Sequence, residues 1–368
     1  MKRVAIIGAA GYVGLELVRQ LQTIDIEVNA VARENGRFLL RDFGIRLVAP
    51  AELCSLGTMD VIVNLAYPTS GSTVNYPTRN QEILEQIKVL MGPSTHLVHV
   101  STQAVFGLAL DRPIVVGPVA QVRDYPYVEA KIQLENLLID QFGANNIEIV
   151  RLGNVWGPGS GSWTVPLVNR VLFSEPVGIQ GVDGYCNATD VANTASYLRH
   201  LIGTDDRGGI RFHHLAEMAS YRWSKWIDRI ESSLGQEAVR ESSMGFRAGN
   251  FRQEVRQAIS PVMPAALYRS FAGGRSSGSW LRTLSRAVGE QRFEAVKSGL
   301  KRSVRTLPTG HEVGAGDQQF LEILSCQTQF KTCVLDGWRP PVDFEASWSL
   351  IEHWMIAAGY TVRGGQQF

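Results

Sequence analysis

The chain has 368 residues, of which 45% are hydrophobic and 19% charged, which is typical of a globular protein with one large or two modest domains. The formal net charge of +1 creates no overall field that would favour nucleic acid as a partner. The four cysteines lie far apart without a CxxC pair, which predicts no disulfide framework, no metal site and a reducing compartment. Neither a signal peptide nor a run of about 18 apolar residues is present, so we expect a cytoplasmic protein.

The first predicted element is a strand over residues 3–7, followed by three closely spaced glycines and an apolar-periodic helix. This order predicts dinucleotide binding: Gly8 permits a tight turn, Gly11 lets the backbone approach a pyrophosphate, and Gly14 lets helix and strand pack closely. The free N–H groups at the start of the helix would face the phosphates. The expected cofactor-binding residues of this turn are Gly8, Ala10, Gly11, Tyr12 and Val13.

The second predicted strand covers residues 26–32 and should end beside the adenine ribose of the cofactor. An acidic residue there would bind the ribose 2′-hydroxyl and favour NAD, but the strand is followed by Arg33, with Arg37 nearby. An arginine binds a 2′-phosphate bidentately, so NADP is favoured and Arg33 is the expected contact. The neighbouring Glu34 keeps NAD open as the alternative.

Two further buried strands are predicted over residues 60–66 and 96–102, with a helix from about Asn80 to residue 90 between them. Because ligands bind at the carboxyl ends of parallel strands, the residues that close these two strands are candidates for cofactor contact. These candidates are Leu65, Ala66, Ser101 and Thr102. His99 lies inside its strand and is expected to be a core histidine.

The segment YPYVEAK, residues 125–131, combines two tyrosines with a lysine. On a helix Tyr127 and Lys131 share one face, whereas Tyr125 does not. An ammonium beside a phenol favours the ionised phenol, so we expect the pKa of Tyr127 to be lowered into a range useful for acid–base catalysis.

Six segments resemble, in order and spacing, the motifs of the extended short-chain dehydrogenase/reductase family, which contains nucleotide-sugar epimerases, dehydratases and reductases. They are GAAGYVG at 8–14, NLA at 64–66, STQAVFG at 101–107, YVEAK at 127–131, RLGNVWGPG at 151–159 and ATDVAN at 188–193. The resemblance covers residues 3 to about 235 and implies an α/β fold: a doubly wound parallel Rossmann sheet with a smaller α/β substrate lobe.

The resemblance implies a role for each residue that matches a motif. Tyr127 would be the general acid/base, and Lys131 would lower its pKa and bind the nicotinamide ribose. Thr102 would hydrogen-bond the reacting oxygen, and Ser101 would lie near the nicotinamide, which exchanges a hydride with the substrate carbon. The residues implied to contact the substrate are Thr102, Gln103 and Asn154.

Departures from the family pattern reduce the number of reactions that we expect of this protein. Gln103 and Ala104 stand where the 4,6-dehydratases have an Asp-Glu pair, and neither side chain can act as an acid or a base, so water elimination is not expected. Phe106 and Trp156 replace tyrosines of the family pattern. The segment before ATDVAN also lacks the arginine that often binds a nucleotide diphosphate.

The expected domains are a cofactor-binding domain over 1–160, whose core elements recur to about 215, and a substrate lobe over 161–240 and 315–368. The lobe and the segments beside it are predicted to contain helices over 163–174, 190–202, 220–234 and from Phe344, with a strand over 210–215. Residues 241–314 are a basic, mainly helical insertion, of which 241–305 contain 12 basic and 4 acidic residues. Residues 280–305 have amphipathic spacing, which suits either a helical cap packed on the enzyme or a basic face that contacts an anionic membrane, an anionic substrate or a partner subunit.

The favoured function is that of an NAD(P)-dependent 4-ketoreductase or 4-epimerase of a nucleotide sugar or related glycosyl compound. One alternative is a reductase of a hydrophobic steroid- or polyketide-like alcohol or ketone, which Phe106, Trp156 and the missing arginine favour. A non-catalytic nucleotide-binding regulator is the other, disfavoured because Thr102, Tyr127 and Lys131 are all present. The family resemblance also implies a homodimer formed through the helices that carry the active-site motifs.

Overall fold

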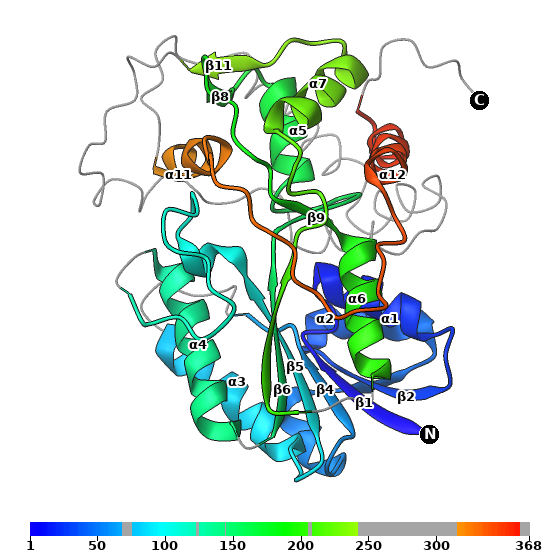
Figure 1. Ribbon diagram of the computed structural model, residues 1–368. Helices are drawn as coiled ribbons and strands as arrows, with labels where there is room; N and C mark the ends of the chain where they lie inside the picture. Colours follow the sequence, from blue (N-terminus) through cyan, green and yellow to red (C-terminus); the bar gives the residue numbers. More distant parts are fainter. Residues whose placement is uncertain (68–75, 123–124, 144, 205–207, 242–314, 361–368) are drawn as a thin grey trace.

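The centre of the molecule is a seven-stranded, fully parallel sheet in the order β10-β6-β5-β4-β1-β2-β3 (Figure 1). The computed structural model describes residues 1–67, 76–122, 125–143, 145–204, 208–241 and 315–360. The strands are β1 (Lys2–Ile7), β2 (Ile26–Val31), β3 (Arg46–Val48), β4 (Val61–Asn64), β5 (His96–Thr102), β6 (Asn146–Leu152) and β10 (Ile210–Leu215). Their apolar runs are buried on both faces because helices cover the sheet on each side.

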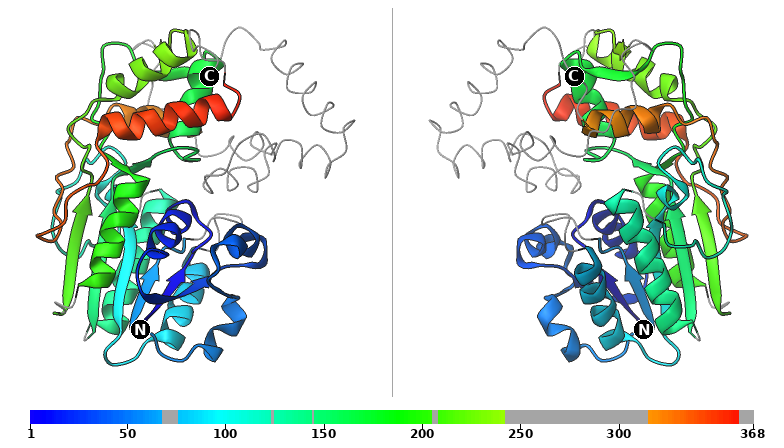
Figure 2. Two further views of the ribbon diagram at one scale, coloured as in Figure 1. Left: turned by 90° about the vertical axis from the view of Figure 1, so that its right-hand side faces the viewer. Right: turned by 90° about the vertical axis from the view of Figure 1, so that its left-hand side faces the viewer.

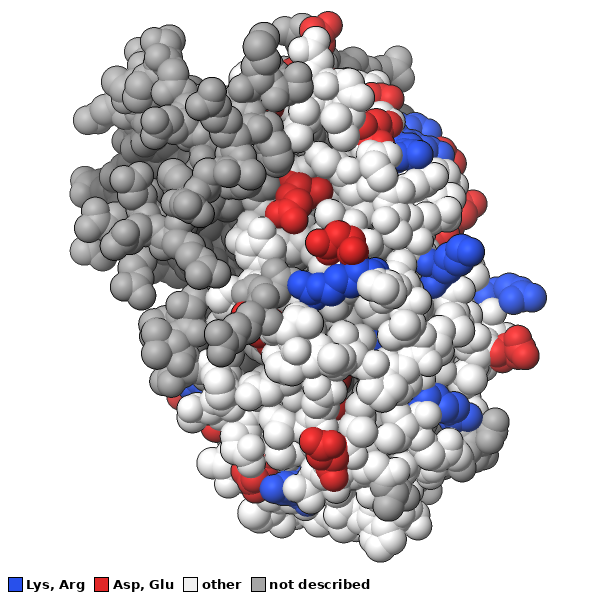
Figure 3. Space-filling model, turned by 60° about the vertical axis from the view of Figure 1, so that its left-hand side comes forward, with Lys and Arg blue, Asp and Glu red and all other residues white. Residues whose placement is uncertain are grey.

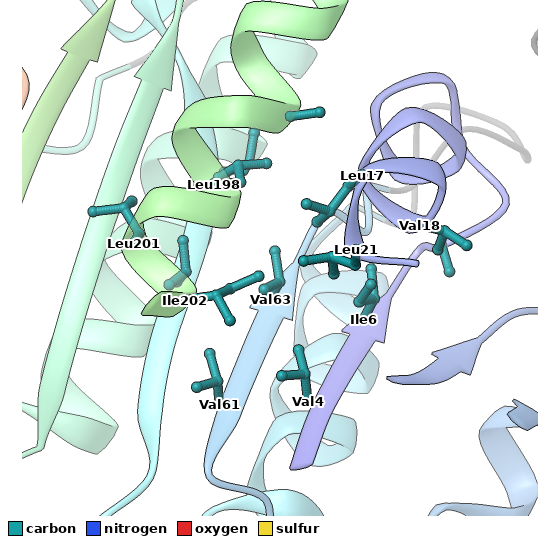
Figure 4. Close-up of a cluster of buried hydrophobic side chains, with 14 of the residues drawn as sticks. Val4, Ile6, Leu17, Val18, Leu21, Val61, Val63, Leu198, Leu201 and Ile202 are labelled. Carbon is teal, nitrogen blue, oxygen red and sulfur yellow. The ribbon is translucent and has the colours of Figure 1, made fainter. Parts of the chain in front are cut away.

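One face of the sheet is covered by α1 (Tyr12–Leu21) and α6 (Val191–Gly203), and the other by α3 (Tyr76–Leu90) and α4 (Pro126–Phe142) (Figure 1). The short helix α2 (Glu34–Leu40) follows β2. Figure 4 shows the core of the first face, where side chains of α1 and α6 pack on those of β1 and β4. The labelled residues are Val4, Ile6, Leu17, Val18, Leu21, Val61, Val63, Leu198, Leu201 and Ile202.

A smaller lobe lies over the carboxyl ends of the strands (Figures 1 and 2). It consists of two parallel strand pairs, β7 with β9 and β8 with β11, and of four helices. The strands are β7 (Asn154–Trp156), β8 (Pro176–Ile179), β9 (Ala188–Asp190) and β11 (Val239–Glu241). The helices are α5 (Thr164–Leu172), α7 (Trp223–Leu234), α11 (Ala315–Leu324) and α12 (Phe344–Ala357).

The lobe has a tryptophan-rich core. Trp156 stacks on Trp226 with the ring centroids 4.1 Å apart, and α12 adds the buried side chains of Trp348, Ile351 and Trp354. The last helix starts at Phe344, as predicted.

Most predicted elements are present with small shifts of their ends, but one helix start is wrong. Helix α3 begins at Tyr76 rather than near Asn80. Asn80 lies inside the helix, where its buried amide donates to the Ala130 carbonyl at 2.9 Å and to Gln133 at 2.8 Å. A polar residue chosen as a helix start is therefore a hydrogen-bonded contact between α3 and α4.

The chain returns to the central sheet after residue 160. Helix α6 packs against α1, and β10 extends the sheet beside β6. Trp338 is buried in the core of the sheet's first face. Within the described part of the chain, no helix is long and apolar enough to cross a membrane.

On the face shown in Figure 3, acidic and basic side chains of the described residues are interspersed. All four cysteines are free. The amphipathic segment 280–305, with its proposed roles, lies outside the described residues.

Candidate active site

The turn after β1 is built by glycines that could not be replaced without a steric conflict. Gly8 has φ +86°, and an added Cβ would lie 2.9 Å from the Ala66 amide nitrogen. At Gly14 an added Cβ would lie 2.6 Å from the carbonyl oxygens of both Gly8 and Ala9. At Gly11 the only atom that it would meet within 4 Å is the Gly8 oxygen, at 3.2 Å, so the described residues leave space above this turn. This is the arrangement that a pyrophosphate needs.

Helix α2 packs its first turn over the same glycine turn. An added Cβ on Gly36 would lie 2.6 Å from the Ala10 Cβ and 3.6 Å from the Ala32 Cβ. Arg33 is the exposed residue that flanks the start of this helix, directly beyond the end of β2, and Glu34 beside it is exposed too. Arg33, which is predicted to favour NADP, and Glu34, which is predicted to favour NAD, are therefore both exposed where the adenine ribose is expected.

The Tyr12 side chain links the glycine turn to the substrate lobe. Its hydroxyl donates to the Pro158 carbonyl at 3.2 Å, and Gly157, with φ +138°, leaves the space that the phenol occupies. Burial raises the pKa of Tyr12, and the nearby Asp190 carboxylate raises it further. Val13, the next residue, lies partly buried in the core under the turn.

Three polar residues are buried where β5 ends and β7 begins. The buried Ser101 hydroxyl has no hydrogen-bond partner among the described residues. Gln103 donates to Asn154 Oδ1 at 3.2 Å, while its own Oε1 is buried without a partner there. Asn154, the first residue of β7, donates to the Cys186 carbonyl at 2.6 Å. Ser101 and Gln103 thus each have a buried side-chain oxygen without a hydrogen-bond partner among the described residues, whereas both the oxygen and the nitrogen of the Asn154 amide form hydrogen bonds.

Helix α4 brings Tyr127 and Lys131 to the end of β5. Pro126 opens the helix, and the Lys131 ammonium donates to the Val100 carbonyl at 3.2 Å. The Thr102 hydroxyl lies beside the Tyr127 phenol and accepts a hydrogen bond from the Ala104 N–H at 3.2 Å. Thr102, Tyr127 and Lys131, the three predicted catalytic residues, therefore lie together.

The expected electrostatic effect of Lys131 on Tyr127 is corrected by the structure. Burial raises the pKa of Tyr127, and the neighbouring Thr102 hydroxyl only partly opposes this rise. Burial also lowers the pKa of Lys131 to about 8, against the opposite influence of Glu135. Loss of water disfavours both charged forms, and helical spacing alone does not reveal it.

Tyr125 lies apart from this group, as its position on the helix predicts. It flanks the start of α4, and its hydroxyl donates to the Glu322 carboxylate on α11 at 2.9 Å. The contact ties the start of α4 to the substrate lobe.

One residue of this site, Tyr67, is missed by the sequence-based prediction. Its ring centroid lies 5.0 Å from that of Tyr127 in an edge-to-face contact and 5.1 Å from the Lys131 ammonium. The available signal is its position directly after Leu65 and Ala66, at the end of β4.

Leu65 and Ala66 form the turn after β4, and the side chains of Asn64 and His99 hold this turn in place. The Asn64 amide contacts His99 Nδ1 at 3.0 Å, and Asn64 Oδ1 accepts from the Ala66 N–H at 3.1 Å. Burial lowers the pKa of His99, with a further contribution from Lys131, so this histidine is a neutral core residue, as expected.

The two aromatic residues that replace tyrosines of the family motifs are buried. Phe106 is 1% exposed and Trp156 is 0% exposed, each inside a hydrophobic cluster. Beside Phe106, the buried Arg151 forms an ion pair with Glu135 at 2.7 Å. This pair fastens α4 to β6 below the catalytic residues.

The fold and the site define a class: a dinucleotide-binding α/β enzyme with a Ser/Thr–Tyr–Lys group at the carboxyl edge of its sheet. The family model described as the NAD dependent epimerase/dehydratase family matches residues 4–193, more than half of the chain. The chain therefore belongs to this family of extended short-chain dehydrogenases/reductases and is an NAD(P)-dependent enzyme. A search among curated proteins finds no match.

Solved structures of low sequence identity share the fold. A UDP-glucuronic acid 4-epimerase from Bacillus cereus, in complex with NAD, is 17% identical with a TM-score of 0.53, covering 66% of this chain and 86% of its own. The ADP-L-glycero-D-manno-heptose-6-epimerase of Helicobacter pylori is 16% identical with a TM-score of 0.52, covering 66% and 85%. A dTDP-glucose 4,6-dehydratase from Bacillus anthracis, in complex with NAD, is also 16% identical with a TM-score of 0.52, covering 66% of this chain and 85% of its own.

Proposed function

We propose that this enzyme is a 4-ketoreductase or 4-epimerase of a nucleotide sugar. The observation that carries the proposal is the convergence of Thr102, Tyr127 and Lys131 at the carboxyl edge of the sheet, beside the glycine turn. The similar structures named above are two nucleotide-sugar epimerases and one dehydratase, which supports the substrate class.

In this proposal Tyr127 transfers the proton at the reacting oxygen. The Thr102 hydroxyl, which lies beside the phenol, would share that oxygen and orient it. The Lys131 ammonium would stabilise the ionised phenol and hold the ribose of the cofactor. A bound nicotinamide supplies the hydride chemistry.

Water elimination, the reaction of a dehydratase, is not part of the proposal. The Gln103 side chain is an amide that is hydrogen-bonded to Asn154, and the Ala104 side chain is a methyl group, so neither can act as an acid or a base. The buried Gln103 Oε1 would instead accept a hydrogen bond from a substrate hydroxyl, and Asn154 would help to keep Gln103 oriented.

We propose NADP as the preferred cofactor. Arg33 is exposed directly beyond β2, where a guanidinium can bind a 2′-phosphate. Glu34 is the residue that would favour NAD instead.

The nucleotide part of the substrate would be held in the lobe formed by residues 161–240 and 315–368. A cavity of about 370 Å³ there has an apolar wall that includes Ile179, Trp223 and Ile227, and its polar lining residues are Gln180, Asp183, Ser224 and Arg240. Arg240 Nη1 is buried without a hydrogen-bond partner among the described residues, although an ion pair joins it to Glu231 at 3.8 Å. A planar base with oxygen acceptors suits such a lining.

The hydrophobic-substrate alternative loses one of its supports in the structure. It depended on Phe106 and Trp156 lining the site, and both side chains are buried in hydrophobic clusters.

A panel of UDP-, dTDP- and ADP-sugars tests the proposal. An epimerase would produce the 4-epimer by NMR with no net change in nicotinamide absorbance. A reductase would oxidise NADPH stoichiometrically with a 4-keto sugar. Turnover of steroid or polyketide ketones, with no turnover of any nucleotide sugar, would contradict it. The homodimer stays a prediction, and light scattering of the purified protein tests it.

A further inference from the structure

Tyr67 lies between three other groups of the candidate site. Its ring packs edge-to-face on Tyr127, with centroids 5.0 Å apart and planes at 79°, and lies 5.1 Å from the Lys131 ammonium. On its other side the ring stacks on Tyr76, with centroids 6.0 Å apart and planes at 26°. Tyr67 therefore joins the start of α3 to the active-site face of α4.

The Tyr67 ring stabilises the Lys131 ammonium, which is buried away from water. Lys131 is buried, and the structure shows the Val100 carbonyl as its hydrogen-bond acceptor, at 3.2 Å. The face of an aromatic ring within about 6 Å attracts a desolvated cation. The Tyr67 ring thus favours the charged form of Lys131 at a place where burial disfavours it.

The contact with Tyr127 restricts the orientation of the phenol. Tyr127 is partly buried. Its ring forms a T-shaped pair with the ring of Tyr67, and its hydroxyl lies beside Thr102. Aromatic pairs of this geometry contribute beyond the area that they bury. The same ring therefore contacts both members of the Tyr127–Lys131 pair.

We propose that Tyr67 is a positioning residue of this active site, whose ring holds the Lys131 ammonium and the Tyr127 phenol in the relative orientation that proton transfer requires. The catalytic role of Tyr67 rests on the function proposed above, whereas its contacts with Lys131 and Tyr127 do not depend on that function. The other ionisable groups that act on or respond to Lys131 are Glu135 on α4 and His99 on β5. Neither is changed by a substitution at Tyr67.

The test compares Y67F, which keeps the ring, with Y67L, which removes it but keeps an apolar side chain over Lys131. The Lys131 titration is followed by NMR of the full-length protein with ¹³C-labelled lysine, with K131M for assignment. We expect Y67L to lower the pKa of Lys131 by roughly half to one pH unit and Y67F to leave it unchanged. This measurement needs no substrate, so its failure is separate from failure of the proposed activity.

With an accepted sugar nucleotide, Y67L should lower kcat by about fivefold to tenfold and leave the substrate KM near its original value, because the ring acts through Tyr127 and Lys131. Y67F should restore kcat. A Lys131 pKa in Y67L equal to that of the unaltered protein, or an equal effect of Y67F and Y67L, would overturn the proposal. If Y67L does not fold by circular dichroism, Y67M provides the same comparison.

Discussion

The Thr102 hydroxyl and the Tyr127 phenol lie beside each other where the end of β5 meets the start of α4. These two residues are 25 positions apart and meet because β5 ends at the edge of the sheet that α4 approaches. Their contact directs the phenolic oxygen towards the carboxyl edge, where the glycine turn also lies.

Replacing Tyr127 by Phe should remove the proton-transfer group and keep the packing. We expect kcat to fall by about a hundredfold to ten-thousandfold. Binding of NADPH, measured by quenching of tryptophan fluorescence, should stay within about twofold. Turnover close to that of the unaltered enzyme would show that another group transfers the proton.

Replacing Arg33 by Ala should weaken NADPH far more than NADH. A hydrogen bond to a charged group contributes about 1.5–3 kcal/mol, so the Kd for NADPH should rise by about tenfold or more. Titration of both cofactors into the purified variant measures the difference. The R37A variant is the matched control, and an equal loss for both cofactors in R33A would contradict the assignment of Arg33.

Replacing Glu135 by Gln should destabilise the region that carries the catalytic residues. The change leaves the Arg151 guanidinium, which is 0% exposed, without its carboxylate partner. Removing one member of a buried ion pair costs about 3–5 kcal/mol. Urea unfolding measures the loss, and E129Q, a change on the same helix at a partly exposed site, should have little effect.

Acid should destabilise the protein through Glu148 on β6. Burial opposes ionisation of this carboxyl, but hydrogen bonds with His213 and Arg211, together with His96, whose Nε2 lies 3.4 Å from Glu148 Oε1, outweigh it and hold its pKa well below the ordinary value. A lowered folded-state pKa gives stability that is complete above the unfolded-state value, about 4.3, and is lost as the pH falls towards the folded-state pKa.

The free energy of unfolding should therefore decline below about pH 5 in the unaltered protein. In E148Q the decline should be smaller and the stability at pH 7 lower. Urea titrations between pH 3 and pH 7 compare the two proteins. Parallel pH dependences would show that Glu148 does not control acid stability.

Much of this protein follows from local sequence patterns. The glycines at 8 and 14 predict the turn because only glycine tolerates the left-handed φ of the first and the carbonyl contacts of the second. Tyr127 and Lys131 share a face because a helix repeats every 3.6 residues. The ends of β1 and β5 meet at one edge because parallel strands with helical crossovers leave no other arrangement.

Only the tertiary structure decides the environment of these groups. The pKa of Tyr127 is raised because burial removes water, a quantity set by neighbours distant in the chain. Tyr67 joins the site because β4 places its final turn against α4, and Asn80 is a buried contact because α3 packs on the same helix. Local periodicity predicts which elements form, whereas the meeting of their side chains depends on how the sheet and helices pack.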